Sequence, residues 1–456
     1  MCLLLCTFLF GAQPNVVLIM SDDMGWGDPG CYGSTQNVTP NLDRLASEGT
    51  RFTSFYATQA VCTSSRCALL SGCYPNRLGL GGVALMPNAK TGLHPSEQTI
   101  ATLLKEAGYH TGVVGKWHLG DNPKFLPPAH GFDESLILPY SNDMWPHGYV
   151  PGDVTRNYPP LPWLVDGVPF GTVKDWTNMD QLTVVQAYRA VRFIRQNAGK
   201  GKPFFLYLAT SMPHTPLGAS VGFKGKGKTP YADTMADIDD KVGDILKALR
   251  DTGVEKDTIV IFTSDNGPWL NFGKHAGSAG PFREGKGTTW EGGVRVPFII
   301  RWPGVVPAGK ESAALAGNLD ILPTLVEACG ASKPKLPIDG QSFWSVAKGA
   351  AEKARGDFSY YYGDKLEAVR VGKWKLHLPH TYRSYENMKP AAVEGRPMAY
   401  TQGKVEWALY DLESDPGERQ DVAAAHPDVV AELKAFAAAE RQRMEESKRP
   451  VGRVGD

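Results

Sequence analysis

The chain has 456 residues, of which 42% are hydrophobic and 21% are charged. These proportions are those of a globular protein and exclude a disordered or collagen-like chain. The length suffices for one large domain with a smaller one, or for two mid-sized domains. The formal net charge is zero, from 48 basic and 48 acidic residues. The broad basic surface of a nucleic-acid-binding protein is therefore absent, and any anion must be bound by a local site.

The first twelve residues, MCLLLCTFLFGA, predict a partial export signal. An apolar run with the length of a signal core precedes Gly11 and Ala12, although the basic segment that usually opens such a signal is missing. An alternative is that these residues extend the first β-strand backwards. The run is too short to cross a bilayer, so we expect no transmembrane segment. We expect an exported protein, with the periplasm favoured over a lysosomal or extracellular location.

Five cysteines follow this leader: Cys31, Cys62, Cys67, Cys73 and Cys329. Their odd number and irregular spacing exclude a disulfide framework. The C-x-x-C pairs expected of a zinc site are also missing. Cys62 is unusual because it heads a run of small hydroxyl residues, CTSSR, beside a permanent cation. At least one thiol is therefore available for another purpose.

Strands and helices are predicted to alternate along the first two thirds of the chain. Short runs rich in β-branched residues, such as NVVLIM at 15–20, are typical of buried strands. In chain order we expect a strand at 15–20, a helix at 40–49, a helix after the cysteine cluster, a helix at 96–108, strands at 110–120 and 203–214, a helix at 231–252, and strands at 258–267 and 296–304. The alternation predicts an α/β fold with a mostly parallel sheet covered on both faces.

The rest of the chain predicts a smaller unit. From about residue 356 the sequence FSYYYGDKLEAVRVGKWKLHL, with VEWALYDL further on, suggests a small antiparallel sheet, and a helix is expected at about 427–448. We therefore expect a large domain at 13–345 and a C-terminal subdomain at 346–456. Residues 144–178 are rich in Pro, Trp and Tyr with little periodicity, which predicts a long functional loop or lid.

The predicted strands end in charged and polar residues. Ligands of open α/β sheets bind beyond the carboxyl ends of the strands. These ends carry Asp22 and Asp23, Lys116 and His118, His214, and Asp265 and Asn266. The carboxylates and the amide form an all-oxygen set that suits Ca²⁺ or Mg²⁺ rather than zinc, although a single Asp-Asp pair is more often a cap or a turn. With the cations Arg66, Lys116 and Lys286, each more often a surface charge when alone, they describe a pocket for a tetrahedral oxyanion ester.

Motifs along nearly the whole chain resemble those of a known enzyme family. They are PNVVLIMSDDMGWGD, TPNLDRLASEGTRFTSFYA, CTSSRCALLSG, GKWHLG, HGFDE, PYSND, MPHTPL, FTSDNG, GKGTTWEGGVRVP and LYDLESDPGE, in this order. The chain resembles the type I, formylglycine-dependent sulfatases, close to the arylsulfatase A and N-acetylgalactosamine-6-sulfatase group. The resemblance implies a sulfuric ester hydrolase with an alkaline-phosphatase-like α/β fold. That fold has a large mixed sheet flanked by helices and a small C-terminal antiparallel sheet plus helix.

The resemblance also gives a reason for the unusual cysteine. In this family the cysteine heading C-x-(Pro/Ser)-x-Arg is oxidised to formylglycine, whose aldehyde hydrates to a gem-diol, and by position this residue is Cys62. One hydroxyl of the diol attacks sulfur, and the other later expels sulfate. Ser64 stands where many relatives have proline. Either an oxygen-dependent formylglycine-generating enzyme or a radical maturation enzyme is therefore an expected partner.

The metal ligands implied by the resemblance are residues already singled out at two strand ends. Asp22, Asp23, Asp265 and Asn266 match the family's ligands, and an oxygen of modified Cys62 completes the set. The expected ion is Ca²⁺, with Mg²⁺ as the alternative. The metal would lower the pKa of the diol hydroxyl that it binds, and Asp265 is placed to take that proton.

The other matched residues are implied to move protons and to hold sulfate. His214, assisted by Lys286, matches the acid that protonates the leaving oxygen, and His118 matches the base that deprotonates the second hydroxyl. Such acid–base steps contribute roughly a hundred- to ten-thousand-fold each. Contacts to the diol and the sulfate oxygens are implied for Arg66, Lys116 and Ser141.

The identity of the substrate depends on the loops. We expect substrate contacts from His147, His275, His380 and Arg383, which lie where relatives build the substrate side of the pocket. The aromatic residues of 144–178 suit the apolar faces of sugar rings. We therefore expect an exo-acting enzyme that releases sulfate from a sulfated glycan or small molecule, with aryl sulfates also accepted. The alternatives are a phosphonate or phosphate-ester hydrolase of the same superfamily, and a catalytically silent binder of sulfated glycans in which Cys62 stays a thiol.

Overall fold

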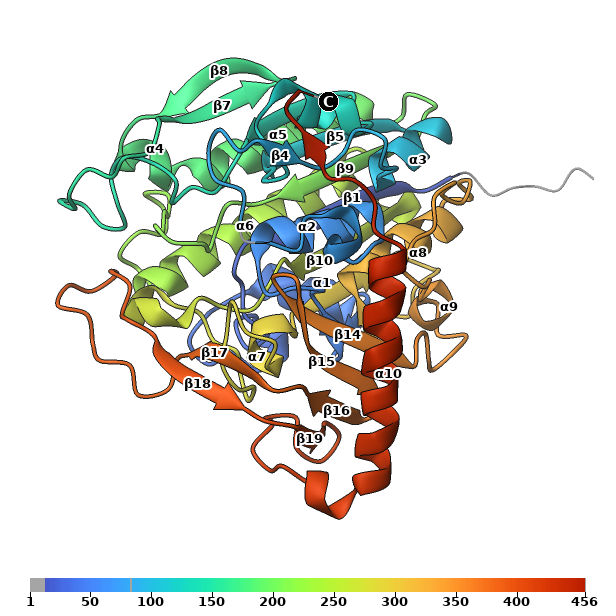
Figure 1. The fold of residues 1–456 in the computed structure, drawn as a ribbon. Coiled ribbons are helices and arrows are strands. Elements are labelled where there is room, and N and C mark those ends of the chain that lie inside the picture. The colour runs from blue at the N-terminus through green and yellow to red at the C-terminus, as the bar shows by residue number, and fades with distance from the viewer. Residues whose placement is uncertain (1–12, 83, 456) are drawn as a thin grey trace, which may run out of the picture.

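A computed structural model describes residues 13–82 and 84–455 of the chain (Figure 1). The predicted export signal at 1–12 lies outside the described residues, and export stays a prediction. No helix in the described part of the chain has both the length and the apolar character that crossing a membrane requires.

A ten-stranded sheet forms the centre of the molecule. Its strands, in spatial order, are β12 (Lys310–Ser312), β2 (Thr50–Phe52), β11 (Phe298–Arg301), β10 (Thr258–Ser264), β1 (Asn15–Ser21), β9 (Phe204–Ala209), β5 (His110–Lys116), β6 (Glu134–Leu138), β7 (Leu161–Val165) and β8 (Val168–Val173). The five strands from β10 to β6 run parallel. Antiparallel pairs flank them on both sides. The parallel sheet predicted from the sequence is thus the middle of a mixed sheet.

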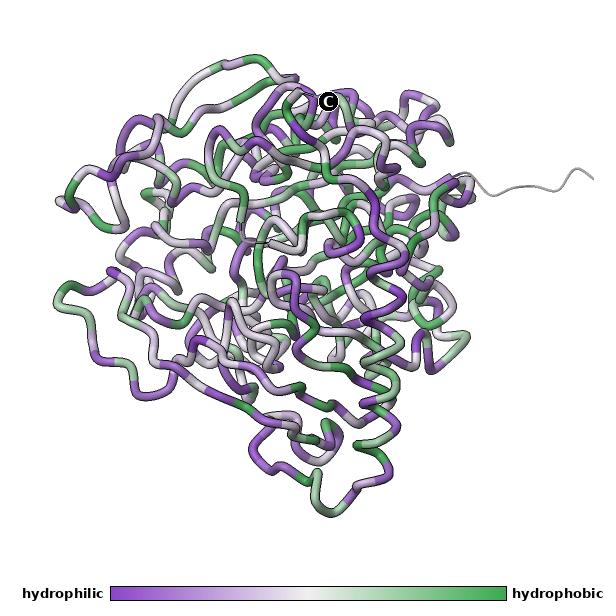
Figure 2. The backbone as a smooth tube through the Cα atoms, in the orientation of Figure 1, coloured by the Kyte–Doolittle hydropathy of each residue, from purple (hydrophilic) through white to green (hydrophobic). Residues whose placement is uncertain are grey.

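Side chains of β1 alternate between two hydrophobic cores, one on each face of the sheet. Val16, Leu18 and Met20 belong to one core, and Val17 and Ile19 belong to the other. The first core is covered by α2 (Cys62–Ser71), α3 (Ile100–Glu106), α8 (Ile321–Ala328) and α9 (Trp344–Ala347). The second is covered by α1 (Pro40–Ser47), α5 (Leu182–Asn197) and α6 (Pro230–Asp251). In Figure 2 the hydrophobic stretches lie mainly inside the molecule, and the outer loops are mainly hydrophilic.

A second, smaller sheet follows in the chain, as expected. It is antiparallel, with the order β14 (Asp357–Tyr362), β15 (Lys365–Val371), β16 (Trp374–His377) and β19 (Ala408–Asp411). The long helix α10 (Pro427–Glu446) packs on it through Leu433, Ala437 and Met444. A separate hairpin of β17 (His380–Ser384) and β18 (Thr401–Val405) projects from its side (Figure 1).

Short pairings join the large and the small parts of the chain. Strand β20 (Gly452–Arg453) returns to pair with β4 (Thr91–Gly92), and Gln59 forms an isolated bridge to Tyr361. Within the large part, β3 (Phe55–Tyr56) pairs with β13 (Ala316–Gly317). Helix α9 crosses the boundary predicted after residue 345, and its residues belong to the core of the large sheet. The division into 13–345 and 346–456 stays a prediction.

The long loop predicted at 144–178 contains regular structure, so that prediction was wrong in part. Strands β7 and β8 form a hairpin at the edge of the large sheet, and α4 (Trp176–Asp180) follows. Asp166 and Gly167 make the two-residue turn with positive φ values of 50° and 84°. Asp-Gly is a strong hairpin signal. Pro162 and Pro169 within the strands, together with the exposure of most of β8, hide the alternation that would have revealed it.

A buried ionic network joins the small sheet to the large part of the chain. The Lys375 ammonium on β16 is fully buried and lies 3.0 Å from the Glu291 carboxylate of α7 (Glu291–Val294) and 2.9 Å from that of Glu418. Glu418 also accepts a hydrogen bond from His377 at 2.8 Å. Burial alone would raise the pKa of Glu418, but Lys375 and His377 lower it to about 2. The network holds α7 and β16 in one position.

Removing one charge from this network should destabilise the fold. Taking away one partner of a buried ion pair costs about 3–5 kcal/mol, so we expect Glu418→Gln to lower the unfolding free energy by an amount in this range. Urea denaturation measures it, with the exposed Glu413→Gln as the matched control. Because the folded state lowers the pKa of Glu418, its contribution is present above the unfolded value of 4.5 and is lost as the pH falls toward 2. A Glu418→Gln protein as stable as the control would contradict the assignment.

Candidate active site

The adjacent strands β10, β1, β9 and β5 deliver polar side chains to one edge of the large sheet, as predicted. Asp22 and Asp23 follow β1, and Asp265 and Asn266 follow β10, with Ser21 and Ser264 paired in register at the strand ends. The backbone N–H of Asp23 donates to the Asp265 carboxylate at 3.0 Å, which connects the two ends directly. Lys116 ends β5, and His214 follows β9. All of these side chains are buried.

Cys62 begins helix α2 instead of preceding it. The sequence predicted a helix after the cysteine cluster, whereas the helix starts at Cys62 itself. Small residues without strong helix propensity are held there by tertiary contacts: Ser64 donates to the Leu80 carbonyl at 2.7 Å, and Asn318 donates to Ser65. The Cys62 sulfur lies 3.5 Å from an oxygen of Asp22. Burial raises the pKa of the Cys62 thiol far above its usual range, despite Lys116 and Lys286, so the unmodified thiol stays protonated and is a poor nucleophile.

Three carboxylates and three cations are interleaved beside Cys62. The Lys116 ammonium lies 2.6 Å from Asp22, and the Lys286 ammonium lies 2.7 Å from Asp23. The Arg66 guanidinium lies 2.8 Å from Asp265 and 3.5 Å from Asp22. Burial works to raise the pKa of Asp22, but Lys116 and Arg66 lower it. For Asp23, burial and the neighbouring carboxylates outweigh Lys286 and raise the pKa to about 7.

The donor set of this cluster fits a hard divalent cation. Asp22, Asp23, Cys62 and His214 each have a ligand atom within 4.8 Å of the others. In the described part of the chain, Oδ1 of Asn266 is buried without a hydrogen-bond partner, although its Nδ2 donates to Asp23 at 2.7 Å. A buried amide oxygen without a donor suits an additional ligand. Carboxylate and amide oxygens are the ligands of Ca²⁺ and Mg²⁺.

His118 is placed as a neutral base. Its φ of 58° is a sparsely populated value that is typical of functional sites. Its Nε2 donates to the Leu85 carbonyl at 3.0 Å, because a carbonyl can only accept. Its Nδ1 is buried and has no hydrogen-bond partner within 13–82 and 84–455. Burial, Lys116 and Arg66 lower the pKa of His118 well below its usual value, so Nδ1 keeps a free lone pair.

His214 has the opposite arrangement of its ring nitrogens. Its Nδ1 donates to the Thr215 carbonyl at 2.5 Å, and its Nε2 lies 3.5 Å from the Asp23 carboxylate. Burial and Lys286 lower the pKa of His214 well below its usual value. A second negative charge near Nε2, such as that of a bound anion, would work against this lowering and favour a proton on Nε2.

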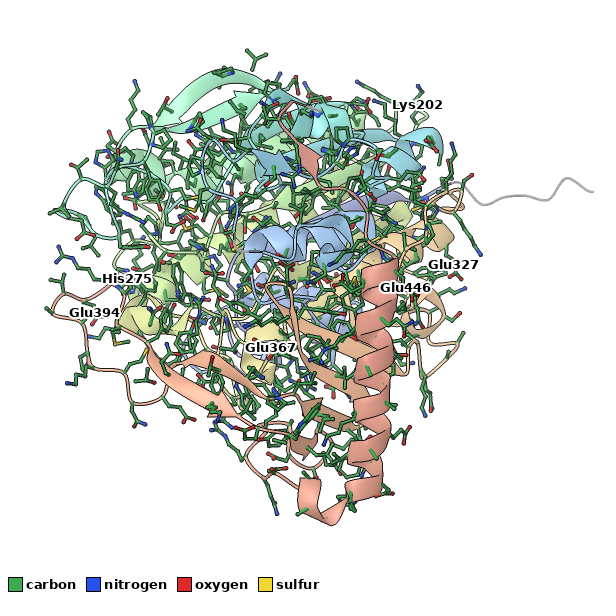
Figure 3. All side chains as sticks on the ribbon, viewed as in Figure 1. Lys202, His275, Glu327, Glu367, Glu394 and Glu446 are labelled. Atoms are coloured by element: carbon green, nitrogen blue, oxygen red, sulfur yellow. The ribbon has the colours of Figure 1, made fainter. Side chains whose placement is uncertain are left out.

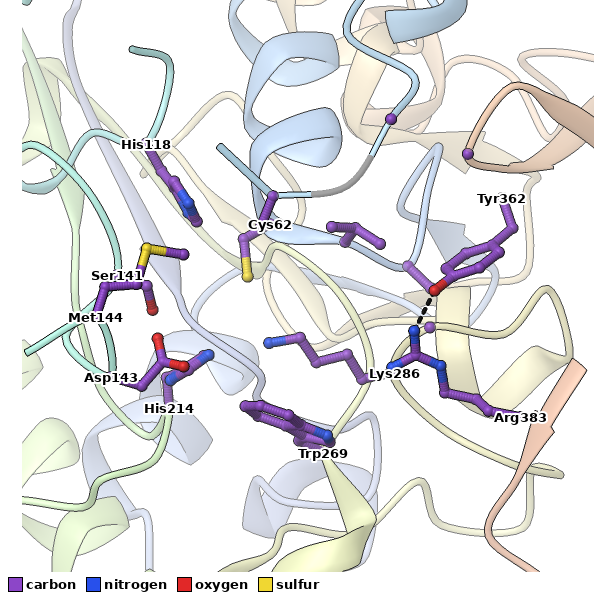
Figure 4. A pocket seen from close by; sticks show the side chains of 16 residues that line it. Cys62, His118, Ser141, Asp143, Met144, His214, Trp269, Lys286, Tyr362 and Arg383 are labelled. Carbon is purple, nitrogen blue, oxygen red and sulfur yellow. Dashed lines mark hydrogen bonds between the residues drawn. The ribbon is translucent and has the colours of Figure 1, made fainter. Parts of the chain in front are cut away.

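A cavity of about 200 Å³ opens above these groups (Figure 4). Six residues singled out from the sequence line it: Cys62, His118, Ser141, His214, Lys286 and Arg383. The hydroxyl of Ser141 accepts a hydrogen bond from the Lys116 ammonium at 3.1 Å. Because Cys62, His214 and Lys286 both contact the charge cluster and line the cavity, the cavity connects the buried cluster to the outside of the molecule.

Three expected substrate contacts lie away from this cavity. His147 is exposed and contacts the Trp145 ring, with a centroid distance of 4.8 Å. His275 lies near Glu394 at the outer edge of the molecule (Figure 3), and Glu394 works to raise its pKa against burial. His380 lies 3.4 Å from the Glu367 carboxylate. None of the three lines the cavity.

Ten other residues that line the cavity were not singled out from the sequence, and the larger or charged ones among them are Asp143, Met144, Trp269 and Tyr362. Asp143 comes two positions after Ser141 in PYSND, and Trp269 closes DNGPW three positions after Asn266. Closeness in sequence could therefore have suggested both. Tyr362 ends β14 of the small sheet, and no local pattern predicts that this strand reaches the cavity.

Comparison with known proteins decides the family. Residues 14–331 match the family model described as Sulfatase, and residues 284–443 match the model described as N-sulphoglucosamine sulphohydrolase, C-terminal. The chain belongs to the sulfatase family. It is a sulfuric ester hydrolase, as the sequence motifs predicted.

The relatives cover nearly the whole chain. Arylsulfatase A of Bos taurus is 37% identical over 440 residues, which are 92% of this chain and 85% of the relative. N-acetylgalactosamine-6-sulfatase of Rattus norvegicus is 39% identical over 430 residues, which are 89% and 80%. The solved structure of the PsFucS1 sulfatase from Pseudoalteromonas sp. superposes with a TM-score of 0.86 at 29% identity, covering 96% of this chain and 92% of that one. The expected sulfatase fold, with its large mixed sheet and its small antiparallel sheet plus helix, is confirmed.

Calcium should stabilise this sulfatase against heat through the acidic cluster. A ligand that binds only the folded state adds about 2.7 kcal/mol to the unfolding free energy at 100 times its Kd. We expect Ca²⁺ to raise the melting temperature relative to a chelator-treated sample, and Asp23→Asn to lose most of this shift. The exposed Asp251→Asn, at the end of α6, is the matched control that keeps it. An equal shift in Asp23→Asn and wild type would exclude this cluster as the calcium site.

Proposed function

We propose that this sulfatase is an exo-acting carbohydrate sulfatase whose nucleophile is made from Cys62 by oxidation to formylglycine. The observation that carries the proposal is the position of Cys62, which lies between the acidic cluster and the floor of the cavity. A thiol with a raised pKa is of little use there, whereas the hydrated aldehyde supplies a hydroxyl nucleophile. Residues 62–66 lie in a helix in the folded protein, so a maturation enzyme that reads an extended segment would act before folding.

The metal part of the proposal places Ca²⁺ on Asp22, Asp23, Asp265 and Asn266, with Mg²⁺ as the alternative. When bound, such a cation polarises sulfate oxygens and lowers the pKa of a hydroxyl beside it. With the three carboxylates matched by three cations, a divalent ion leaves the site positive, which favours an anionic sulfate ester. The Asp265 carboxylate is available to take a proton from the nucleophile.

The two histidines divide the proton transfers between them. Nδ1 of His118 is the free acceptor of a neutral ring, which suits the base that acts on residue 62 during sulfate release. Nε2 of His214 is the nitrogen left free by the bond to Thr215, and a proton there can pass to the leaving oxygen. Lys286 lies in the cavity wall beside them and assists by neutralising the leaving oxygen.

The sulfate group itself would be held by the cations Lys116 and Arg66 and by the hydroxyl of Ser141. Lys116 is positioned by both Asp22 and Ser141. Arg66 is fixed by Asp265. Charge-assisted hydrogen bonds of this kind are shorter and stronger than neutral ones. Sulfur would therefore be presented to residue 62 in one orientation.

The size of the cavity supports attack at the end of a sugar chain. At about 200 Å³ it is smaller than the 300–1,000 Å³ typical of sites for larger organic ligands. It has room for a sulfate and one ring. Trp269, Met144 and Tyr362 give it apolar walls that suit a sugar ring. Both curated relatives named above are sulfatases, and one is named for a sulfated amino sugar.

Substitution of Cys62 tests the nucleophile. In Cys62→Ser a single hydroxyl can attack sulfur, but no second hydroxyl exists to expel sulfate. We therefore expect a stable sulfated serine after one turnover, seen by mass spectrometry as one added sulfo group on the tryptic peptide. Cys62→Ala should neither turn over nor gain the group. Sustained turnover by Cys62→Ser would refute the two-hydroxyl mechanism, and an unmodified thiol in active wild-type enzyme would refute the conversion.

A substrate panel tests the substrate class. We expect the highest kcat/KM for terminally sulfated galactose, N-acetylgalactosamine or glucosamine units, and lower values for 4-nitrophenyl sulfate and for aryl phosphonates. Internal sulfates in longer oligosaccharides should be inert because the cavity holds one ring. If every sugar is inert while aryl sulfate turns over well, the carbohydrate part of the proposal fails. If the phosphonate is preferred, the alternative function in the same superfamily replaces it.

A further inference from the structure

Opposite charges without ionic partners lie on the two sides of the cavity. Asp143 lies on the side of Ser141 and His214, and Arg383 lies on the opposite side next to Tyr362 (Figure 4). Across residues 13–82 and 84–455, the Asp143 carboxylate accepts no side-chain or backbone hydrogen bond and makes no ion pair. Arg383, within the same ranges, pairs with no carboxylate.

This distinguishes Arg383 from the cations of the charge cluster. Lys116, Lys286 and Arg66 are each matched by a carboxylate of the cluster at less than 3 Å. Their charges are therefore balanced within the protein. The charge of Arg383 is balanced by nothing that the structure describes, and it faces the space where the leaving group must lie.

The Arg383 side chain is nevertheless held in a defined position. Its guanidinium donates to the Tyr362 hydroxyl and lies 5.5 Å and 5.0 Å from the ring centroids of Tyr362 and Tyr400. It also packs on Gly287, where a Cβ atom would come within 2.8 Å of the guanidinium carbon. An arginine held by aromatic rings and backbone has lost most of its freedom before a ligand binds. Such pre-organisation is expected of a recognition group and not of a solvated surface charge.

The chemistry of the two side chains determines what each can bind. A guanidinium only donates hydrogen bonds and matches the planar oxygens of a carboxylate or sulfate. A carboxylate only accepts, so Asp143 requires a hydroxyl or ammonium donor and repels anions. A leaving group with an acidic substituent is therefore driven to place that substituent at Arg383 and its hydroxyls at Asp143.

We propose that the sugar released by this sulfatase carries a second acidic group, a carboxylate or a sulfate ester, which Arg383 binds while a hydroxyl of the same unit donates to Asp143. The inference rests on the proposed carbohydrate sulfatase function and adds the charge of its substrate. It assigns the choice between singly and doubly acidic sugars to one side chain of the β17–β18 hairpin.

The test compares matched substrates. Terminally monosulfated galactose and N-acetylgalactosamine units are assayed beside the same units carrying a second sulfate, and a monosulfated glucose unit is assayed beside the matching glucuronic acid unit, with 4-nitrophenyl sulfate in parallel. We expect wild type to favour the doubly acidic member of a pair by roughly 10- to 100-fold in kcat/KM, the range for hydrogen bonds to charged groups. Arg383→Gln should bring this ratio to about 1. Arg383→Lys should keep part of this preference, because lysine retains the positive charge but lacks the planar guanidinium with its paired N–H donors.

Arg419→Gln is the matched control. This exposed arginine of the same part of the chain pairs with Glu386 at 3.3 Å, away from the cavity, so it should leave the substrate ratio as in wild type. A wild-type ratio near 1, or an Arg383→Gln protein that loses activity on both members of a pair equally, would overturn the inference. Aryl sulfate turnover in the same samples separates the failures: if it persists, only the second acidic group is refuted, and if it is absent, the proposed function fails as well.

Discussion

The Arg66 guanidinium connects the three chain segments on which the site depends. It lies in the first turns of α2, donates two hydrogen bonds to Asp265 beyond β10, and donates a third to the Lys116 carbonyl at the end of β5. Because a buried charge without its partners costs several kcal/mol, these segments are stable only in one mutual arrangement. Cys62 lies one helical turn before Arg66, on the same face of α2. The ion pair that anchors the helix therefore also directs Cys62 toward the acidic cluster.

The cavity is composite, and its two parts come from different sheets. The reactive groups come from the edge of the large sheet, whereas Tyr362 and Arg383 come from the small sheet and the hairpin beside it. The loop that carries Lys286 links the two. Tyr385 donates to the Lys286 carbonyl at 2.6 Å, and Glu284 accepts from Ser384 at 2.7 Å. The buried network around Lys375 holds α7, which follows this loop, against the small sheet.

Much of the fold and of the buried site could be predicted from the sequence. Strands such as β1 and β10 are buried along their whole length and read as continuous apolar runs, and parallel strands must end at one edge of a sheet. The carboxylates that follow them were therefore expected together, and their charges then require the cations. The shared edge follows from the geometry of parallel strands, and the presence of cations follows from the need to balance buried carboxylates. Both can be inferred from one sequence.

The outer wall of the cavity could not be predicted in the same way. His147, His275 and His380 were expected at the cavity, but His147 packs on its neighbour Trp145. His275 and His380 lie instead beside Glu394 and Glu367. Tyr362 reaches the cavity only because the small sheet docks on α7. The β7–β8 hairpin was missed because proline and exposure remove the alternation on which strand prediction depends. Contacts between segments that are distant in the chain produce no periodic pattern in the sequence, so they could not be predicted from it.

The position of Arg383 on a hairpin outside both sheets has an evolutionary consequence. The β17–β18 hairpin pairs with no other strand in the described structure, and only Tyr382 and Val405 of its two strands join a small hydrophobic cluster around Trp290. Its other strand positions can therefore vary without disturbing the cores of the two sheets. Natural variation there would alter which sulfate esters fit while the charge cluster under Cys62 stays unchanged. A fold built in this way can change the range of sulfate esters that it accepts through substitutions in one short peripheral segment.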